Sequence, residues 1–452
     1  MRTVITAFGI RTTLAQLKAT APEWHAIPVA ERVSRLRQWR KTLARTAPAY
    51  AEDLVGYHGR SHADTLVAEV MPLAAAMAWL ERAAPSLLAP QRRGVIGRPL
   101  WLPGVRSTVV REPFGLVLIL APANYPLLLA GVQMVQALAA GNAVAVKPAP
   151  GTAATLQRFV DAGHKAGVPM GALHLLPDSH ETGAAALEGP IDLVVLTGSA
   201  ATGRAVRRQL APRGIPVIEE LSGADAVLLL PDADLERAAR AIAYGLTLNG
   251  GATCIAPRRI FGTATQLDAL VTRLALPTTP VPLHPPAIER MHRLHREAGA
   301  AWHGPAPEGD RMAPAVILPA SADQMTADIF GPVAGLIPVA TMAEAVATLV
   351  AAPEQLGAAI FGNPAAAAQL AAAVPAGVVT INDLIVPTAD PRLPFGGRQG
   401  SGQGVTRGVE GLLALTRPKV VITRSGRMLP HLEPERADAA ALFSRALRWL
   451  YG

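Results

Sequence analysis

The sequence is poor in several residue types, and each shortage excludes a class of protein. A single cysteine, Cys254, in 452 residues rules out an internal disulfide. Charged residues make up only 17% of the chain, below the roughly 25% of an average soluble protein. Apolar types reach 50%, so the chain can bury large cores, and intrinsic disorder is excluded for most of it.

Lysine is also rare, because arginine supplies almost all of the basic residues. The 42 basic and 34 acidic residues leave a net charge of +8. The arginines are scattered along the sequence, and aromatic residues make up only 4%. Proteins that bind nucleic acid combine basic clusters with stacking aromatics, so we expect no nucleic-acid partner.

No segment reads as a secretory signal or as a continuous membrane-spanning helix. The apolar stretch near the N-terminus is interrupted by Arg11 and Thr12. The most apolar window, residues 114–146, contains Pro122 and Pro126, which divide it into strand, turn and helix. We therefore expect a cytoplasmic protein with little membrane contact.

Hydrophobic spacing predicts an α/β protein with two domains. Helical spacing runs from Ala21 to about Leu88, and short β-branched runs alternate with helices from Phe114 onwards. This alternation predicts a parallel sheet with helices on both faces, for which a dinucleotide-binding fold is the first candidate. After Leu235 the pattern restarts and continues to about Leu384, which predicts a second α/β domain.

Two further segments stand outside this alternation. The stretch from Pro277 to Pro286 is rich in proline and predicts a surface connection. Near the C-terminus, residues 437–451 show apolar side chains on one helical face, with Arg445 and Arg448 opposite. We expect an amphipathic helix there.

Cys254 lies in an unusual local sequence, Asn-Gly-Gly-Ala-Thr-Cys-Ile-Ala-Pro, at residues 249–257. Two glycines before the thiol and a proline after it restrict the backbone, whereas an inert core cysteine normally lies within a regular apolar element. The sequence leaves both readings open, a nucleophilic thiol and a buried inert one.

Two other groups could work with a thiol. Glu219 and Glu220 directly follow a predicted strand at residues 215–218, at the rim where α/β enzymes place their chemistry, and one of them could activate water. Asn124 lies between prolines at the end of another predicted strand and could donate to an anionic oxygen. Each feature taken alone is also consistent with solvated loop carboxylates and an ordinary turn asparagine.

A possible cofactor site follows from two strand ends. In residues 196–203 a strand passes through a glycine turn into a helix that begins at Ser199, and the free amides of such a helix suit a pyrophosphate. Lys147 ends another strand and could bind ribose hydroxyls. The alternatives are an ordinary capped helix and a solvated lysine. His292 and His295 have metal-ligand spacing but no third ligand nearby, so we expect no metal.

Taken in order, these segments resemble the aldehyde dehydrogenase superfamily over nearly the whole chain. They look most similar to its class 3 branch, which includes fatty and aromatic aldehyde dehydrogenases. The motifs are Asn-Tyr-Pro at 124–126, Glu-Leu-Ser-Gly at 220–223, Thr-Cys-Ile-Ala-Pro at 253–257, Asp-Ile-Phe-Gly-Pro at 328–332 and Pro-Phe-Gly-Gly at 394–397.

The resemblance implies a fold, a domain division and an activity. The expected fold is α/β, with a Rossmann-type cofactor domain, a second α/β catalytic domain and a small β oligomerisation arm. The expected ranges are 1–95 and 114–222 for the cofactor domain, 223–410 for the catalytic domain, 96–113 and 411–430 for the arm, and 431–452 for the C-terminal helix. The implied activity is oxidation of an aldehyde to a carboxylic acid with NAD or NADP, in a homodimer.

The same resemblance assigns roles to individual residues. Cys254 would be the nucleophile that forms a thiohemiacetal and then a thioacyl-enzyme, Glu220 would activate the water for deacylation, and Asn124 would join the Cys254 amide in the oxyanion hole. Lys147 and Ser199 would contact the adenosine ribose and pyrophosphate. The full set of expected cofactor contacts is Ala121, Pro122, Lys147, Thr197, Gly198, Ser199, Gly203, Leu221, Asp328 and Phe330.

Several positions depart from the family pattern. Ala123 replaces a usual Trp, Ala252 a Gln, Ser222 a Gly and Asp328 a Glu. Pro150 stands where the family often has a Glu that pairs with the ribose hydroxyls, so we expect NADP to be accepted alongside NAD.

Two alternative functions remain open. An acyl-transferring reductase, linked to CoA or phosphate, is disfavoured because Glu220 occupies the position of the water-activating residue. A degenerate binding protein is disfavoured because all three chemical groups are present. Arg258 and Arg392 are the nearest candidates to anchor a substrate carboxylate, and none flanks Asn124 directly, so we expect an apolar aliphatic or aromatic aldehyde.

Overall fold

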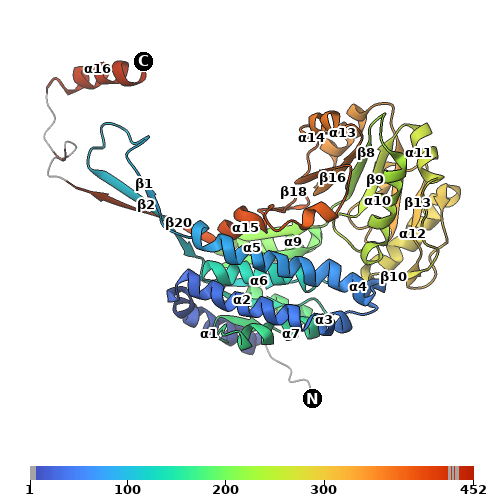
Figure 1. Cartoon of the computed structure of the whole chain (residues 1–452), viewed down its shortest axis with the longest axis horizontal. Helices are drawn as coiled ribbons and strands as arrows, with labels where there is room; N and C mark the ends of the chain where they lie inside the picture. The colour runs from blue at the N-terminus through green and yellow to red at the C-terminus, as the bar shows by residue number, and fades with distance from the viewer. Residues whose placement is uncertain (1–6, 426–428, 430–431, 433–436) are drawn as a thin grey trace. The chain divides into compact units, whose positions relative to one another are not determined.

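The computed structural model describes residues 7–425, 429, 432 and 437–452. The chain divides into two compact units (Figure 1). The first unit comprises Met1–Ala89 and Arg111–Arg417 and contains both predicted α/β domains; the second comprises Pro90–Val110 and Pro418–Gly452.

The bounds of the two units differ from the predicted domain ranges at several places. Residues 111–113, predicted in the arm, belong to the first unit. Strand β1 (Gln91–Arg93) belongs to the second unit and not to the cofactor domain. Residues 411–417 belong to the first unit and not to the arm, because Leu412 and Leu415 are buried in the largest core of that unit. The predicted boundary at residue 430 lies outside the described residues.

The cofactor domain is built on a six-stranded sheet in the order β19-β7-β6-β3-β4-β5. Neighbouring strands are parallel except at β19, which pairs antiparallel with β7. The strands are β3 (Leu116–Leu120), β4 (Ala143–Lys147), β5 (Leu173–Leu175), β6 (Leu193–Gly198), β7 (Val217–Leu221) and β19 (Gly402–Gln403).

Helices cover both faces of this sheet because alternate strand residues face two different cores. In β3, Val117 and Ile119 pack with α2, α5, α6 and α7, whereas Leu116 and Leu118 pack with α1, α8 and α9. Figure 1 shows α2, α5 and α6 stacked on one another. The helices of this domain are α1 (Ala7–Ala26), α2 (Val29–Arg45), α3 (Ala47–Asp53), α4 (His62–Thr65), α5 (Met71–Leu87), α6 (Leu128–Ala140), α7 (Ala153–Lys165), α8 (His180–Leu187), α9 (Ala200–Leu210) and α15 (Gly408–Ala414).

The strand order creates a topological switch point at β3. From this strand the sheet continues through β4 on one side and through β6 on the other. In open α/β sheets a crevice forms at the carboxyl ends of the strands at such a point, and ligands bind there.

The second domain repeats this architecture with a seven-stranded sheet in the order β11-β13-β14-β9-β8-β16-β17. The strands are β8 (Asp225–Leu229), β9 (Pro257–Gly262), β11 (Trp302–His303), β13 (Ala315–Ile317), β14 (Val333–Pro338), β16 (Gly357–Phe361) and β17 (Val378–Ile381). Its helices are α10 (Leu235–Thr247), α11 (Ala264–Val271), α12 (Ile288–Ala298), α13 (Met342–Ala351) and α14 (Pro364–Ala371). Two short ribbons complete it, β10 (Val281–Pro282) with β12 (Arg311–Met312), and β15 (Glu354–Gln355) with β18 (Arg398–Gln399).

The second unit contains a three-stranded sheet in the order β1-β2-β20. Its long strands are β2 (Val105–Pro113) and β20 (Thr416–Arg424). The predicted amphipathic C-terminal helix is confirmed as α16 (Ala439–Tyr451).

One segment within the described residues, His62–Leu87, is long and apolar enough to cross a membrane by length and composition. Leu73, Met77 and Leu80 of this segment are almost completely buried in the core of the cofactor domain. One face of the segment therefore packs in the core of the cofactor domain.

The packing of α2 on α7 generates a stability prediction. A β-carbon on Gly163 would lie 2.9 Å from two ring carbons of Trp39, whose indole donates to the Phe159 carbonyl at 2.8 Å and cannot easily move. A glycine to alanine change in a helix normally stabilises by roughly 0.5–1 kcal/mol, but we expect Gly163→Ala to destabilise by about 1–3 kcal/mol. Urea unfolding followed by circular dichroism measures this.

Gly183→Ala is the matched control, since the new methyl group would meet only Lys147 at 3.7 Å, and it should not destabilise. Equal stability of Gly163→Ala and wild type would contradict the packing argument.

Candidate active site

One cavity of about 1080 Å³ brings the predicted site residues together. It is lined by the carboxyl ends of β3, β4, β6 and β7 and by the loop that carries Cys254. Of the thirteen predicted residues, Gly203 alone does not line it. The twelve that do are Cys254, Glu220, Asn124, Ala121, Pro122, Lys147, Thr197, Gly198, Ser199, Leu221, Asp328 and Phe330.

The loop before Cys254 has a backbone that its glycines make possible. Asn249, Gly250 and Gly251 all have positive φ angles, and a β-carbon on Gly251 would lie 2.5 Å from the backbone of Gly331. The thiol that follows is not surrounded by a regular apolar element. Burial raises its pKa to about 12, and the nearby carboxyl groups of Asp225 and Glu220 add to the rise. At neutral pH the group is therefore a thiol that needs a proton acceptor.

Glu220 lies inside strand β7 and not after it, which corrects the predicted strand end at residue 218. Both Glu219 and Glu220 are buried, so the alternative of two solvated loop carboxylates is wrong. They alternate along the strand: Glu219 forms an ion pair with Arg207, whereas Glu220 lines the cavity and accepts a hydrogen bond from the Thr406 hydroxyl.

The carboxyl group of Glu220 is suited to exchange protons near neutral pH. Burial raises its pKa to about 7, although the Arg407 guanidinium and a hydrogen bond with Thr197 oppose the rise. Thr197 is in turn held by Gln133, whose amide donates to its hydroxyl at 3.0 Å.

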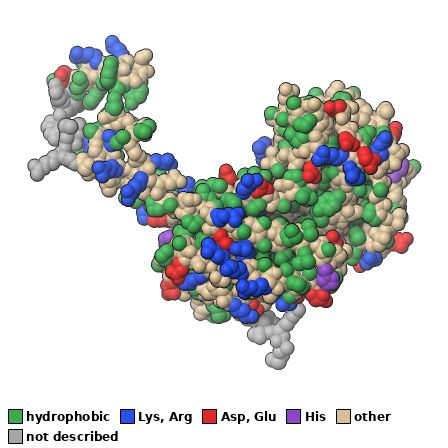
Figure 2. All heavy atoms as spheres, viewed as in Figure 1, with side chains coloured by type: hydrophobic (Ala, Val, Ile, Leu, Met, Phe, Trp, Pro, Cys, Tyr) green, Lys and Arg blue, Asp and Glu red, His purple; other side chains and the backbone are tan. Residues whose placement is uncertain are grey.

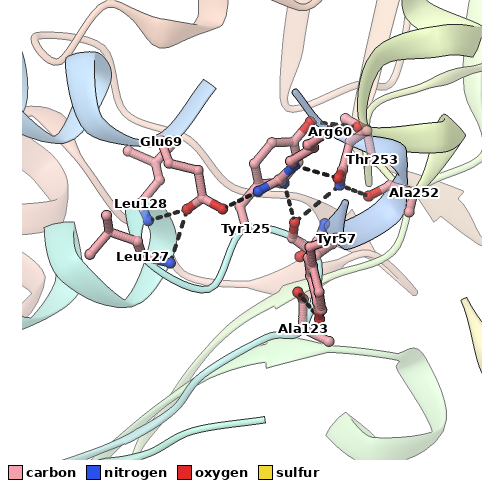
Figure 3. A network of polar contacts seen from close by, with 11 residues as sticks. Tyr57, Arg60, Glu69, Ala123, Tyr125, Leu127, Leu128, Ala252 and Thr253 are labelled. Atoms are coloured by element: carbon pink, nitrogen blue, oxygen red, sulfur yellow. Dashed lines mark hydrogen bonds and ion pairs between the residues drawn. The ribbon is translucent and has the colours of Figure 1, made fainter. Parts of the chain in front are cut away.

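Asn124 is buried in the turn that follows β3. Its backbone joins a polar network around Arg60 and Glu69, two residues that Figure 3 labels. Its backbone carbonyl accepts hydrogen bonds from the side chains of Arg60 and Asn249, and the residue lines the cavity. The Arg60 guanidinium also donates to Asn249 Oδ1 at 2.7 Å, so one side chain ties the Asn124 loop to the loop before Cys254.

A carboxylate balances the buried charge of Arg60. Glu69 forms an ion pair with Arg60, and its other oxygen accepts from the backbone amides of Leu127 and Leu128 at 2.9 and 2.7 Å. Both side chains are almost completely buried. Figure 3 shows Glu69 between these amides and the guanidinium. Nothing in the sequence pattern indicated either residue.

The cofactor end of the cavity has the features expected of a dinucleotide site. Ser199 caps α9 by accepting from the Thr202 amide at 3.1 Å, so the helix points its N-terminus at the cavity that both residues line. Gly203 acts through packing, because a β-carbon there would lie 2.8 Å from Leu221 Cδ1. Lys147 ends β4 and is buried, which lowers its pKa, so it is not a solvated surface lysine.

Asp328 and Phe330 line the same cavity, and each of them also contacts a further side chain. The Asp328 carboxylate is 3.2 Å from the Arg290 guanidinium. The Phe330 ring packs edge-on against His284, which comes from the proline-rich segment. That segment, expected to be only a surface connection, therefore also lines the cavity through His284, Pro285 and Pro286.

Arg407 is a charged residue of the site that sequence reasoning missed. It follows Thr406 with a φ of 60°, lines the cavity, donates to the Thr388 carbonyl at 2.9 Å and lies over the Phe395 ring at 4.3 Å. The sequence did contain one signal for this residue, because Arg407 lies only three residues after Gly404, which closes the glycine-rich segment.

The two arginines named as possible carboxylate anchors are otherwise engaged. Arg258 is buried and donates to the backbone carbonyls of Gly251, Gly331 and Val333. Arg392 is exposed and is paired with Asp390 at 2.6 Å. Neither lines the cavity.

A partly buried thiol, a carboxyl group whose pKa is raised to about 7 and a buried asparagine line one cavity, at a sheet edge of the kind that binds dinucleotides. This combination is typical of an oxidoreductase. The model of the aldehyde dehydrogenase family matches residues 5–421, so the chain belongs to that family. It catalyses the NAD(P)-dependent oxidation of an aldehyde to a carboxylic acid.

Individual relatives agree with this assignment. The chain is 30% identical to a 4,4'-diapolycopene aldehyde oxidase of Methylomonas, over 98% of this chain and 87% of that protein. It is 29% identical to a probable coniferyl aldehyde dehydrogenase of Pseudomonas aeruginosa, over 87% and 86%. Among solved structures, an aldehyde dehydrogenase of Mycobacterium tuberculosis complexed with NAD+ aligns with a TM-score of 0.85 and 28% identity, covering 94% and 92%. An NADP-dependent glyceraldehyde-3-phosphate dehydrogenase of Bacillus halodurans complexed with NADP gives 0.85 and 26%, covering 93% and 92%.

The charge of Arg407 generates a prediction about pH dependence. Removing this cation should make Glu220 and Cys254 harder to ionise, so the rise of activity with pH should move to higher pH by roughly one unit or more in Arg407→Met. The pH profile of steady-state turnover measures this. Arg407→Lys keeps the charge and should shift the profile less, and Arg392→Met removes an exposed cation and should leave it in place. An unchanged profile in Arg407→Met would show that the charge does not act on the site.

Proposed function

We propose that the substrate is a bulky apolar or aromatic aldehyde, and that Cys254, Glu220 and Asn124 carry the reaction. The observation that carries the proposal is that these three groups, from three separate elements, line one large cavity. Many of the other residues that line the cavity are apolar or aromatic. They include Leu128, Leu129, Tyr244, Leu248, Ile385, Val386 and Phe395.

The order of proton movements follows from the ionisation of the two reacting groups. The Cys254 thiol is protonated at rest, so Glu220 accepts its proton as Sγ adds to the aldehyde carbon. The Asn124 amide and the backbone amide of Cys254 donate to the oxyanion that forms. When bound in the cavity, the nicotinamide supplies the acceptor for the hydride that leaves the thiohemiacetal.

Deacylation uses the same carboxylate again. The thioester on Cys254 is attacked by water, from which Glu220 removes a proton, and the carboxylic acid leaves as the thiol takes up a proton. The hydroxyl of Thr406 holds Glu220 in place for both steps.

Three observations support an apolar substrate. Arg258 and Arg392 do not reach the cavity, so the anchors considered for an anionic aldehyde are absent from its lining. The proline-rich segment adds apolar surface. The names of two relatives refer to diapolycopene aldehyde and to coniferyl aldehyde.

A burst experiment tests the assigned roles. Rapid mixing of enzyme and cofactor with aliphatic and aromatic aldehydes should give a burst of reduced nicotinamide in the wild type. We expect Cys254→Ala to give no burst, because no thiohemiacetal can form. In Glu220→Gln we expect a slower burst, because the thiol has lost its proton acceptor, and accumulation of whatever acyl-enzyme does form, with steady turnover falling by about 100-fold or more. Full deacylation in Glu220→Gln, or a burst in Cys254→Ala, would refute the roles proposed here.

We also propose that both NAD and NADP serve as cofactors. Pro150 lines the cavity close to Lys147 and carries no charge that would repel a 2′-phosphate. Introducing a carboxylate with Pro150→Glu should raise the KM for NADP by about 10-fold or more, since like charges repel strongly in a partly buried site, while the KM for NAD changes little. Initial-rate measurements with both cofactors check this. A wild-type KM for NADP more than about a thousandfold above that for NAD, roughly 4 kcal/mol, would contradict the proposal.

The homodimer, the class 3 relationship and the cytoplasmic location stay predictions. Strand β20 is the outer strand of the three-stranded sheet of the second unit and could pair with a second copy of the chain. Sedimentation velocity of the purified chain measures the assembly directly.

A further inference from the structure

Arg258 is a buried cation that donates to three backbone carbonyls. It lies in strand β9, four residues after Cys254, and only 1% of its surface is exposed. Figure 2 shows many other Arg and Lys side chains on the surface of the molecule. Burying a charged group is costly unless it is paired and hydrogen-bonded, so the partners of Arg258 show what this residue holds in place.

The three carbonyls belong to two segments that the proposed reaction uses. One carbonyl is that of Gly251, in the loop three residues before Cys254. The others are those of Gly331 and Val333, and they follow Phe330, an expected contact of the nicotinamide. One guanidinium therefore joins the loop of the proposed nucleophile to the segment that would hold the reactive end of the cofactor.

The two segments also touch each other directly. A β-carbon on Gly251 would lie 2.5 Å from the carbonyl carbon of Gly331 and 2.5 Å from the nitrogen of Pro332. Gly251 has a φ of 71°, so a glycine is needed here both for the backbone conformation and for the close approach. Because packed backbones cannot move independently, a displacement of residues 331–333 also displaces the loop before Cys254.

A carboxylate balances the charge of Arg258. Asp225 begins β8 and lies opposite Pro257 on the neighbouring strand β9. Burial lowers the pKa of Arg258 to about 10, and the Asp225 carboxylate opposes this change. Burial raises the pKa of Asp225 to about 7, and the Gly357 amide and the Arg258 cation oppose that rise. Arg258 therefore keeps its charge at neutral pH, and charged donors form the stronger hydrogen bonds.

We propose that Arg258 is a positioning residue that couples the cofactor-binding segment, residues 328–333, to the loop that carries Cys254. It does not line the cavity, so it acts through its backbone contacts and not on the substrate. Cofactor bound to the segment fixes its position, and the guanidinium and the backbone contact pass this order to the loop before the thiol. The inference rests on the proposed function, in particular on the roles of Cys254, Asp328 and Phe330.

The next residue in the strand, Arg259, provides a comparison. It is also buried, and it donates to the Met325 carbonyl at 2.8 Å and to the Glu354 carboxylate at 3.4 Å. Neither partner belongs to the loop before Cys254. If a buried arginine only stabilised the domain, removing either side chain would have the same effect, whereas the coupling depends on Arg258 alone.

Alkylation of Cys254 tests the coupling, because this residue is the only cysteine of the chain. The rate of its reaction with iodoacetamide is followed by mass spectrometry of the full chain, with and without saturating NAD and without aldehyde. We expect the ratio of the rates with and without NAD to be at least about 5-fold higher in the wild type than in Arg258→Met, since coupling between two sites typically begins at this size. Shielding of the thiol by bound nicotinamide is common to both proteins and cancels in this comparison.

Further variants separate coupling from loss of stability. Arg258→Met leaves the Asp225 carboxylate buried without its cation, which destabilises the fold, so the change is also made together with Asp225→Asn and should give the same loss. Arg258→Lys keeps the charge but not the forked donors, and it should retain part of the ratio. The matched control, Arg259→Met, should keep the wild-type ratio. Circular dichroism and calorimetry with NAD confirm that each variant is folded and saturated.

Two outcomes would overturn the proposal. One is an equal ratio in the wild type and in Arg258→Met. The other is an equal loss in Arg259→Met, because a general loosening of the domain would then explain both results. Neither outcome would affect the proposed reaction, since the measurement involves no aldehyde and no turnover. The roles of Cys254 and Glu220 are tested separately by the burst experiment.

Discussion

The buried ion pair between Arg60 and Glu69 is the interaction on which the active site depends. The Arg60 guanidinium reaches the loop that carries Asn124 and the loop that precedes Cys254, and Glu69 binds the first two amides after the Asn124 turn. Taking two charges out of water costs several kcal/mol per ion, and the pair recovers this only through good geometry and additional hydrogen bonds. Here those additional bonds are the contacts that join the Asn124 loop to the loop before Cys254.

Much of the architecture could be predicted because it follows from local patterns. Apolar strands such as Leu116–Leu120 read directly as buried parallel strands, and the residues at their ends, such as Lys147, therefore fall at one edge of the sheet. The glycines in two other segments are also explained by local structure. Those in residues 198–203 lie at the start of a helix, and those in residues 249–251 lie in a turn with positive φ angles. Twelve of the thirteen predicted site residues accordingly line one cavity.

The remaining features depend on contacts between residues far apart in sequence, which no local pattern encodes. Arg60 and Asn249 are 189 positions apart, and Thr406 and Glu220 are 186 positions apart. The two neighbouring glutamates show most clearly what the sequence could not predict. Both lie within β7, so they point to opposite faces: Glu219 pairs with Arg207, and Glu220 lines the cavity. The predicted strand ended at residue 218, so this alternation was not expected. The boundary expected at residue 411 could not be placed correctly for a similar reason. Leu412 and Leu415 belong to a core built mainly from residues before position 220, and no local pattern shows this contact.

For the proposed substrate and mechanism, the cavity imposes a conflict between binding an apolar aldehyde and ionising the groups that would react with it. The same burial that gives an apolar lining raises the pKa of Cys254 and that of Glu220, because a charge is poorly solvated there. Glu220 keeps a pKa near 7 because a cation and a hydroxyl group oppose the effect, and Cys254 has less compensation. In the proposed mechanism the thiol therefore uses the carboxylate as its proton acceptor, which gives Glu220 a part in the first half of the reaction as well as in hydrolysis. The two roles are compatible because Glu220 must lose that proton again before it can activate water, and a pKa close to neutrality permits both transfers.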